Sequence, residues 1–376
     1  MKILHINSYY STTKLYTDMY QHQRDAGIPF QVYVPISNQY PEEKLKVTPA
    51  EDITVSRCFN KNDRFIFHVK HKKILQDLLE KINPQEFTLL HAHSLFSNGW
   101  LAYQLNKRYG IPYVVAVRSA DERTFFGKVP WMRKTGIDIM KNASQIVYIS
   151  KNTQNIVMEN YVPSKYQEEF SAKTHVIPNG IDEFWHQHQY ANKLPVVHNP
   201  LRIISVARLH PEKRLVPLAE MTKMYNDNYG PLELHIVGSN DTDKIKKELC
   251  QFDHVTYHGQ KSKEEILQLF REMDIFALLS TRETFGLVYV EAMSQGLPII
   301  YSKNEGFDSF FESGAVGISV QNNDHLGLNQ AIDHIYVNYE KLSQNTVKES
   351  AQFNWPEIIQ TYKDIYQSIS KEQIND

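Results

Sequence analysis

The sequence predicts an α/β protein of doubly wound architecture, and three observations support this prediction. Short apolar segments alternate with segments of helical periodicity from the first residue, the pattern of a parallel sheet covered by helices. The alternation stops at a polar, proline-containing segment near residues 183–200 and then restarts. The chain of 376 residues is also longer than one hydrophobic core comfortably supports. We therefore expect two domains of similar design.

The predicted elements follow in order along both halves. In the first half, strands are predicted at residues 3–6, 31–34, 87–90, 112–117 and 145–149, with helices at 14–26, 67–82, 99–109 and 151–160. In the second half, strands are predicted at 202–206, 232–237, 255–257, 275–279 and 297–301. These patterns place a first domain at 1–185, a second at 195–354 and a closing helix at 355–376. The closing helix should bury an apolar stripe: Trp355, Ile358, Tyr362, Ile365 and Ile369.

Composition limits the classes of function. The chain is 41% hydrophobic and 22% charged, as in ordinary folded soluble proteins, and its net charge of −2 gives no general attraction for nucleic acid. No apolar run is long enough to span a bilayer, and MKILHINSYY is interpreted as a strand rather than a signal peptide, so we expect a cytoplasmic protein. Cys58 and Cys250 lie far apart without metal-ligand spacing, which favours reduced thiols.

An acidic block in the second half is the strongest candidate site. Residues 281–300 read TRETFGLVYVEAMSQGLPII, with Glu283 in a strand-to-helix loop and Glu291 in the helix that Gly296 and Pro298 end. Both carboxylates can border one crevice at the carboxyl edge of a sheet. The residues that begin the helix offer backbone N–H groups and a helix dipole to a phosphate: Phe285, Gly286 and Leu287. Acids beside an anion-binding helix start suggest a nucleotide-sugar site.

The block resembles the E-x7-E motif of retaining glycosyltransferases of GT-B architecture, and residues 255–300 are similar to glycosyltransferase family 4 throughout. The resemblance implies two Rossmann-like domains facing an interdomain cleft, with the donor in the C-terminal domain and the acceptor mostly in the N-terminal domain. FNWPEIIQTYKDIY resembles the family's closing helix, which crosses back to the N-terminal domain. The implied reaction moves a sugar from a nucleotide-diphosphate sugar to an acceptor hydroxyl with retention, without a cofactor or metal.

Two cations and the acids receive roles by this resemblance. VARLHPEKR places Arg208 at a strand end and Lys213 in the next loop, where fixed positive charges suit a leaving diphosphate. The resemblance implies that Glu291 accepts hydrogen bonds from the ribose. It also implies that Glu283 holds a hydroxyl of the donor sugar or steadies positive charge at its anomeric carbon.

Two glycines and an asparagine complete the expected donor site. Gly238 and Gly259 end successive strands, where a backbone can come close to the ligand, and are expected to flank the nucleotide base. The alternative for both is simple turn chemistry. Asn304 follows the next strand and is expected to reach the donor sugar.

The first domain supplies weaker candidates. The family usually has a glycine pair after its first strand, whereas residues 7–14 contain none, so hydroxyls of residues 11–13 and the Lys14 ammonium are candidate replacements. The His-x-His pair that ends at His93 suggests a metal, but no third ligand of matching spacing follows it, so we expect an acceptor contact or a core histidine instead. Arg118 and Asp121 are acceptor candidates by their position after a strand.

Aromatic and basic residues mix at 64–73 and 125–137, which suggests peripheral contact with an anionic membrane; ordinary amphipathic helices are the alternative. Expected partners are a nucleotide-sugar donor, with UDP favoured as the commoner base, and a carbohydrate, lipid-linked or protein acceptor. The resemblance suggests bacterial surface-polysaccharide or glycolipid synthesis. Two other functions stay open: a GT-B nucleotide-sugar epimerase or hydrolase, and a non-catalytic nucleotide-sugar-binding partner subunit.

Overall fold

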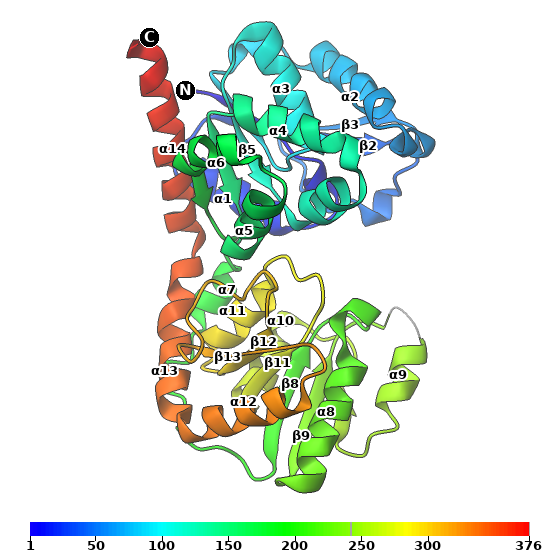
Figure 1. Cartoon of the computed structure of the whole chain (residues 1–376), viewed down its shortest axis with the longest axis vertical. Helices are drawn as coiled ribbons and strands as arrows, with labels where there is room; N and C mark the ends of the chain where they lie inside the picture. Colours follow the sequence, from blue (N-terminus) through cyan, green and yellow to red (C-terminus); the bar gives the residue numbers. More distant parts are fainter. Residues whose placement is uncertain (241–242, 376) are drawn as a thin grey trace. The chain divides into compact units, whose positions relative to one another are not determined.

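The computed structural model describes residues 1–240 and 243–375. Contacts divide the chain into two compact units (Figure 1). The first unit consists of Met1–Pro178 together with the helix that begins at Trp355, and the second unit is Asn179–Asn354. Residues 179–185, which we expected in the first domain, therefore fold with the second unit. The predicted α/β class with two doubly wound domains is confirmed.

The first unit is built on a parallel sheet. Among the described residues it has seven strands in the order β3-β2-β1-β4-β5-β6-β7. Their bounds are β1 Ile3–Ile6, β2 Phe30–Ser37, β3 Ile53–Phe59, β4 Leu89–Ala92, β5 Tyr113–Val117, β6 Gln145–Tyr148 and β7 Thr174–Val176. The winding direction reverses between β1 and β4, and in α/β sheets ligands bind beside the carboxyl ends of the strands at such a reversal.

Helices cover both faces of this sheet. They are α1 Leu15–Asp25, α2 Phe67–Lys81, α3 Ser97–Tyr109, α4 Arg133–Asn142, α5 Lys151–Asn160, α6 Ser164–Ala172 and α14 Trp355–Asn375. One apolar core joins one face of the sheet to α2, α3 and α4, and the other joins the opposite face to α1 and α14. Figure 1 shows α14 running beside α1. The predicted apolar stripe on α14 is buried in this second core, which confirms that the helix packs on the N-terminal sheet.

The second unit repeats the design with a shorter sheet. Its described strands number six, all parallel, in the order β10-β9-β8-β11-β12-β13. They are β8 Leu201–Val206, β9 Leu232–Val237, β10 Val255–Tyr257, β11 Ile275–Leu278, β12 Ile299–Ser302 and β13 Gly317–Val320. The helices are α7 Glu183–Gln187, α8 Leu215–Asn228, α9 Asp243–Leu249, α10 Lys263–Glu272, α11 Leu287–Ser294, α12 His325–Val337 and α13 Tyr339–Ser350. Here the winding reverses between β8 and β11.

Three strands were not predicted, and all three lie at sheet edges. β3 is half exposed, β7 has three residues, and β13 begins at a glycine, so none presents the continuous apolar run of a central strand. β4 begins two residues later than expected, at Leu89, because Phe87 ends a 3-10 turn instead of opening the strand. This shift brings His91 into the strand.

Candidate active site

Lys213 and Glu283 meet at the point where the second sheet changes its winding direction. Lys213 lies in a 3-10 turn, Pro211–Lys213, after β8, and Glu283 lies in the loop after β11. The Lys213 ammonium is 2.6 Å from the Glu283 carboxylate, and the two side chains are 26% and 13% exposed. A cation and an acid that are partly open to solvent therefore stand at the edge where α/β sheets bind ligands.

The Glu283 loop is fixed by neighbours on both sides. The Ser280 hydroxyl donates to the Glu283 carboxylate at 3.1 Å, and the Gly306 N–H donates to the Glu283 carbonyl at 3.0 Å. The Thr281 N–H donates to the Glu212 carbonyl at 2.8 Å, which ties this loop to the turn that carries Lys213. Ser280 was not among the residues predicted for the site. Its position at the end of an apolar strand, three residues before Glu283, is the signal that could have identified it.

The residue before α11 must be a glycine. Gly286 has φ +83°, and a Cβ there would lie 2.4 Å from the Tyr289 ring, whose hydroxyl donates to the Leu278 carbonyl at 2.6 Å. Leu287 is the first residue of the helix. The Phe285 side chain is 2% exposed and packs in an aromatic cluster with Phe310. Phe285 can thus offer a ligand its backbone but not its ring.

Glu291 lies in the second turn of α11 and is partly exposed. Burial raises the pKa of its carboxyl to about 7, while the Lys263 ammonium and the Trp185 indole lower it in part. Lys263 is itself ion-paired with Asp182. The Glu291 carboxyl is therefore partly protonated near neutral pH, and no described residue forms an ion pair with it, which leaves it able to exchange hydrogen bonds with a ligand.

The glycines that end β9 and β10 differ in what requires them. A Cβ on Gly238 would lie 1.9 Å from the Ala207 carbonyl oxygen, so close packing of neighbouring strands demands glycine there without any ligand. Gly259 has φ +74° and nothing within 4 Å of an added Cβ. Packing against Ala207 therefore explains Gly238 by a structural role alone, whereas Gly259 has open space beside it for a ligand.

The remaining donor candidates lie at the same edge of the second sheet. Arg208 follows β8 and has an exposed side chain. Asn304 is exposed, has φ +62°, and donates its N–H to the Asp308 carboxylate at 2.6 Å. A Cβ on Gly306 would lie 2.0 Å from the Thr284 carbonyl oxygen, so the Asn304 loop packs directly on the Glu283 loop.

In the first unit, the glycine-free turn after β1 satisfies its own polar groups. The Asn7 side chain accepts hydrogen bonds from the N–H groups of Tyr9 and Tyr10, which lie in the 3-10 helix Ser8–Ser11. The Ser11 hydroxyl donates to the Ser8 carbonyl at 2.8 Å, and the Thr12 hydroxyl donates to the Tyr9 carbonyl at 2.9 Å. The first use of these hydroxyls is therefore to close the turn.

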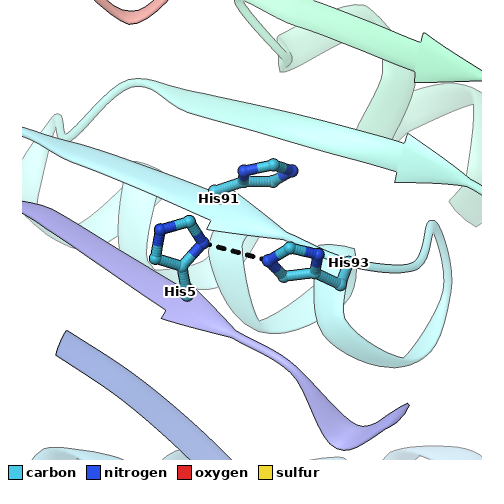
Figure 2. Close-up of side chains that lie close together, drawn as sticks. All are labelled: His5, His91 and His93. Atoms are coloured by element: carbon cyan, nitrogen blue, oxygen red, sulfur yellow. Dashed lines mark hydrogen bonds between the residues drawn. The ribbon is translucent and has the colours of Figure 1, made fainter. Parts of the chain in front are cut away.

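Three buried histidines gather beside this turn (Figure 2). His5 of β1 pairs in register with His91 of β4, and His93 follows β4. One ring nitrogen from each lies within 4.8 Å of the others, and His5 Nδ1 is 3.0 Å from His93 Nε2. The sequence argument against a third ligand was therefore wrong, because pairing of β1 with β4 supplies His5, which lies far away along the chain.

The histidine cluster is partly hydrogen-bonded within the core, while His91 Nε2 and His93 Nδ1 have no partner among the described residues. Gln23 lies 3.0 Å from His5 Nε2, and the Tyr366 hydroxyl lies 2.6 Å from His91 Nδ1. Burial lowers the pKa of all three imidazoles, so the rings are neutral. The cationic Arg118 lowers the pKa of His91 and His93 further and would also repel a metal ion. We therefore interpret the cluster as core structure, and the absence of a metal requirement stays a prediction.

Arg118 directly follows β5, and Asp121 is the first residue of the π-helical segment Asp121–Phe126. The Asp121 carboxylate accepts backbone N–H groups of Leu95 at 3.0 Å, Phe96 at 3.1 Å and Arg118 at 2.9 Å. Its side chain is 2% exposed. Asp121 therefore holds two loops together, and this geometry gives no support to the acceptor contact expected from its position. Arg118 donates from Nε to the His93 carbonyl at 3.2 Å.

The comparisons with known proteins follow the division of the fold. Residues 187–353 match the family model described as glycosyl transferases group 1, and residues 14–183 match that described as glycosyltransferase family 4. The first half of the chain therefore matches glycosyltransferase family 4 and the second half matches glycosyl transferases group 1, and together the two matches identify the chain as a glycosyltransferase.

Individual relatives are distant. The alpha-monoglucosyldiacylglycerol synthase of Acholeplasma laidlawii is 25% identical over 273 residues, covering 66% of this chain and 67% of the relative. A sucrose-phosphate synthase structure from Thermosynechococcus elongatus aligns with TM-score 0.75 at 16% identity, over 99% of this chain and all of that one. The Anabaena protein HepE in complex with UDP-glucose aligns with TM-score 0.68 at 17% identity, over 98% of this chain and 100% of HepE. The two structures establish the shared GT-B fold.

Proposed function

We propose that this glycosyltransferase moves a sugar from a UDP-sugar to an acceptor hydroxyl, with retention at the anomeric carbon and without a metal ion. In this reaction the bond between the anomeric carbon and the β-phosphate oxygen breaks, and a bond to the acceptor oxygen forms on the same face. The acceptor proton passes to the departing phosphate. A pathway of surface-polysaccharide or glycolipid synthesis would use such a step.

The ion pair between Lys213 and Glu283 is the observation that carries the proposal. Negative charge grows on the β-phosphate as the anomeric bond breaks, so a fixed ammonium lowers the barrier by binding the leaving group more tightly in the transition state. Lys213 is held 2.6 Å from Glu283 before any ligand binds. In the proposal, Lys213 and Arg208 bind the diphosphate beside the start of α11, and Glu283 turns to a hydroxyl of the donor sugar.

Two further residues extend the donor site in this proposal. Glu291 takes the ribose hydroxyls, because no described residue forms an ion pair with its partly protonated carboxyl. Gly259 admits the base, since the space beside its Cα is open. The UDP preference is supported by the fold shared with HepE, which was solved with UDP-glucose.

Thermal unfolding with a panel of UDP-, GDP-, ADP- and TDP-sugars, with and without EDTA, tests the donor directly. A ligand that binds only the folded protein raises the midpoint. We expect a UDP-sugar to raise it equally in EDTA. Stabilisation by another nucleotide alone would refute the UDP assignment, and a shift that EDTA abolishes would refute metal independence.

Turnover tests the mechanism. Lys213→Ala and Glu283→Gln should each lower sugar transfer by about a hundredfold or more while the protein stays folded. Lys223→Ala is the matched control, because it removes an exposed lysine of the same unit that pairs with Asp227 one turn along its own helix. Hydrolysis of the donor at the same rate without any acceptor would favour the hydrolase alternative. The anomeric configuration of the product, read by NMR, decides retention.

We further propose that the first unit meets its acceptor at an anionic membrane. The apolar-basic surface consists of large exposed side chains and neighbouring cations: Phe65, Ile66, Val69 and Trp131 with Arg64, Lys72, Lys128 and Lys134. Phe65 is 75% and Trp131 78% exposed. The rings of Phe67 and Phe125 lie 5.8 Å apart, so the two sequence segments are in contact beneath these exposed side chains. In the described part of the chain, no helix combines the length and apolarity needed to cross a bilayer.

Sedimentation with phosphatidylglycerol vesicles tests this surface. Aromatic side chains at the interface and cations near anionic lipid both favour binding. The double variant Phe65→Ser, Trp131→Ser should weaken vesicle binding by about tenfold or more. Tyr229→Ser is the control, since Tyr229 is 59% exposed on the second unit. Absence of binding by the unaltered protein at low salt would refute the membrane proposal and leave the transferase proposal intact.

A further inference from the structure

Arg118 is a buried cation at the ligand-binding edge of the first sheet. It follows β5 directly, and 9% of the residue is exposed. Its Nε donates to the His93 carbonyl at 3.2 Å, and its charge acts on the phenols of Tyr9, Tyr16 and Tyr362. A guanidinium has five N–H donors in a planar fork. The contact with His93 uses one of them and a hydrogen bond with Tyr16 uses another, so the fork retains donors for a ligand.

The nearest carboxylate does not neutralise this fork by direct contact. Both Asp121 oxygens are occupied by the backbone N–H groups of Leu95, Phe96 and Arg118 itself. Within residues 1–240 and 243–375, no carboxylate forms an ion pair with the Arg118 guanidinium. Keeping a buried cation without such a partner opposes folding, because water must be removed from its charge. An arginine held in this state is prepared for an anion that arrives with a ligand.

The chemistry of the surroundings selects the kind of anion. A guanidinium fork matches the paired oxygens of a phosphoryl group, and phenol hydroxyls can donate to the remaining oxygen. The Arg118 charge and a hydrogen bond oppose the rise in the Tyr16 pKa that burial causes, so Tyr16 lies within reach of the fork. Tyr9, which follows β1, is partly exposed and also senses Arg118.

We propose that Arg118 binds a phosphoryl group of the acceptor, so that the first unit selects phosphorylated acceptors. This inference rests on the proposed transferase function and names the substrate class of its acceptor side. Asp121 is a positioning residue in this site, because its carboxylate fixes the backbone of Arg118 and of the loop after β4. The phosphoryl group belongs either to a sugar phosphate or to the head of a phospholipid.

Calorimetric titration of the full chain distinguishes these sources. The probes are glucose 6-phosphate and glycerol 3-phosphate, with glucose and glycerol as neutral controls, each titrated with and without saturating UDP. We expect one phosphate probe to bind more tightly than its neutral control. Arg118→Gln should weaken that binding by about tenfold to a hundredfold, and Arg118→Lys by less, since it keeps the charge but loses the fork. Arg108→Gln, at an exposed arginine of α3, should have no effect.

Three results would overturn the assignment. In the first, the protein binds neither phosphate probe. In the second, the unaltered protein and Arg118→Gln bind the probe equally well. In the third, Arg118→Gln loses affinity for UDP, which would place Arg118 in the donor site. If the unaltered protein does not bind UDP, the proposed function is contradicted instead. The titrations without UDP then still test whether Arg118 binds a phosphoryl group. Circular dichroism and the unfolding midpoint of each variant establish that it is folded, and partial rescue by Arg118→Lys separates a ligand contact from a structural role.

Discussion

Replacing Asp121 should damage the fold of the first unit more than any direct contact with substrate would explain. Its carboxylate accepts three backbone N–H groups at 2.9–3.1 Å and is 2% exposed. Asp121→Ala leaves these buried donors without an acceptor, which should lower the free energy of unfolding by roughly 3–5 kcal/mol. Asp121→Asn keeps one carbonyl oxygen and should cost roughly 1–3 kcal/mol.

Hydrogen exchange measured by segment is the suitable assay, because two units need not unfold together and one midpoint would mix them. The amides of Leu95 and Phe96 should exchange faster in Asp121→Ala, while segments of the second unit keep their protection. Asp138→Asn is the control, since its carboxylate pairs only with exposed Lys134 one helical turn away. If Asp121→Ala kept full protection at these amides and only weakened acceptor use, the structural role argued above would be refuted.

Three other predictions concern the second unit. The folded protein keeps the Glu291 proton up to about pH 7, whereas the unfolded chain loses it near pH 4.5. The contribution of this carboxyl to the free energy of unfolding therefore falls as the pH rises between these two values. In urea unfolding, Glu291→Gln should be more stable than the unaltered protein by roughly 1–3 kcal/mol at about pH 8, but not at about pH 4. Gly238→Ala should lower the free energy of unfolding by about 3 kcal/mol or more, because the new Cβ would clash with the Ala207 carbonyl oxygen. Gly259→Ala should lower it by only about 1 kcal/mol, because the cost there is the positive φ alone. Equal losses for the two variants in urea unfolding would show that close packing is not what requires Gly238. Ser280→Ala should reduce turnover by about three- to tenfold by removing one hydrogen bond to Glu283, and an unchanged rate in a steady-state assay would show that this bond is not needed.

Much of the second unit could be predicted because its signals are local. β9 and β10 have the expected bounds, and α11 begins at Leu287, one of the three residues expected to open that helix. The positions of Lys213 and Glu283 after strands could likewise be predicted, since each motif contains both the strand end and the functional residue. Contact between the two could not, because they are brought together by pairing of β8 with β11.

The first unit shows more clearly what could not be predicted from the sequence. The sequence by itself determined the alternating strands and helices, the two-part chain and the apolar stripe of α14, since each depends on periodicity within a short segment. Only the tertiary structure placed His5 beside His91 and His93, and only it revealed that the Asp121 oxygens are occupied by backbone amides. Such roles depend on which strands are neighbours and on which hydrogen bonds remain unmade once the chain is packed. No spacing along the sequence specifies either.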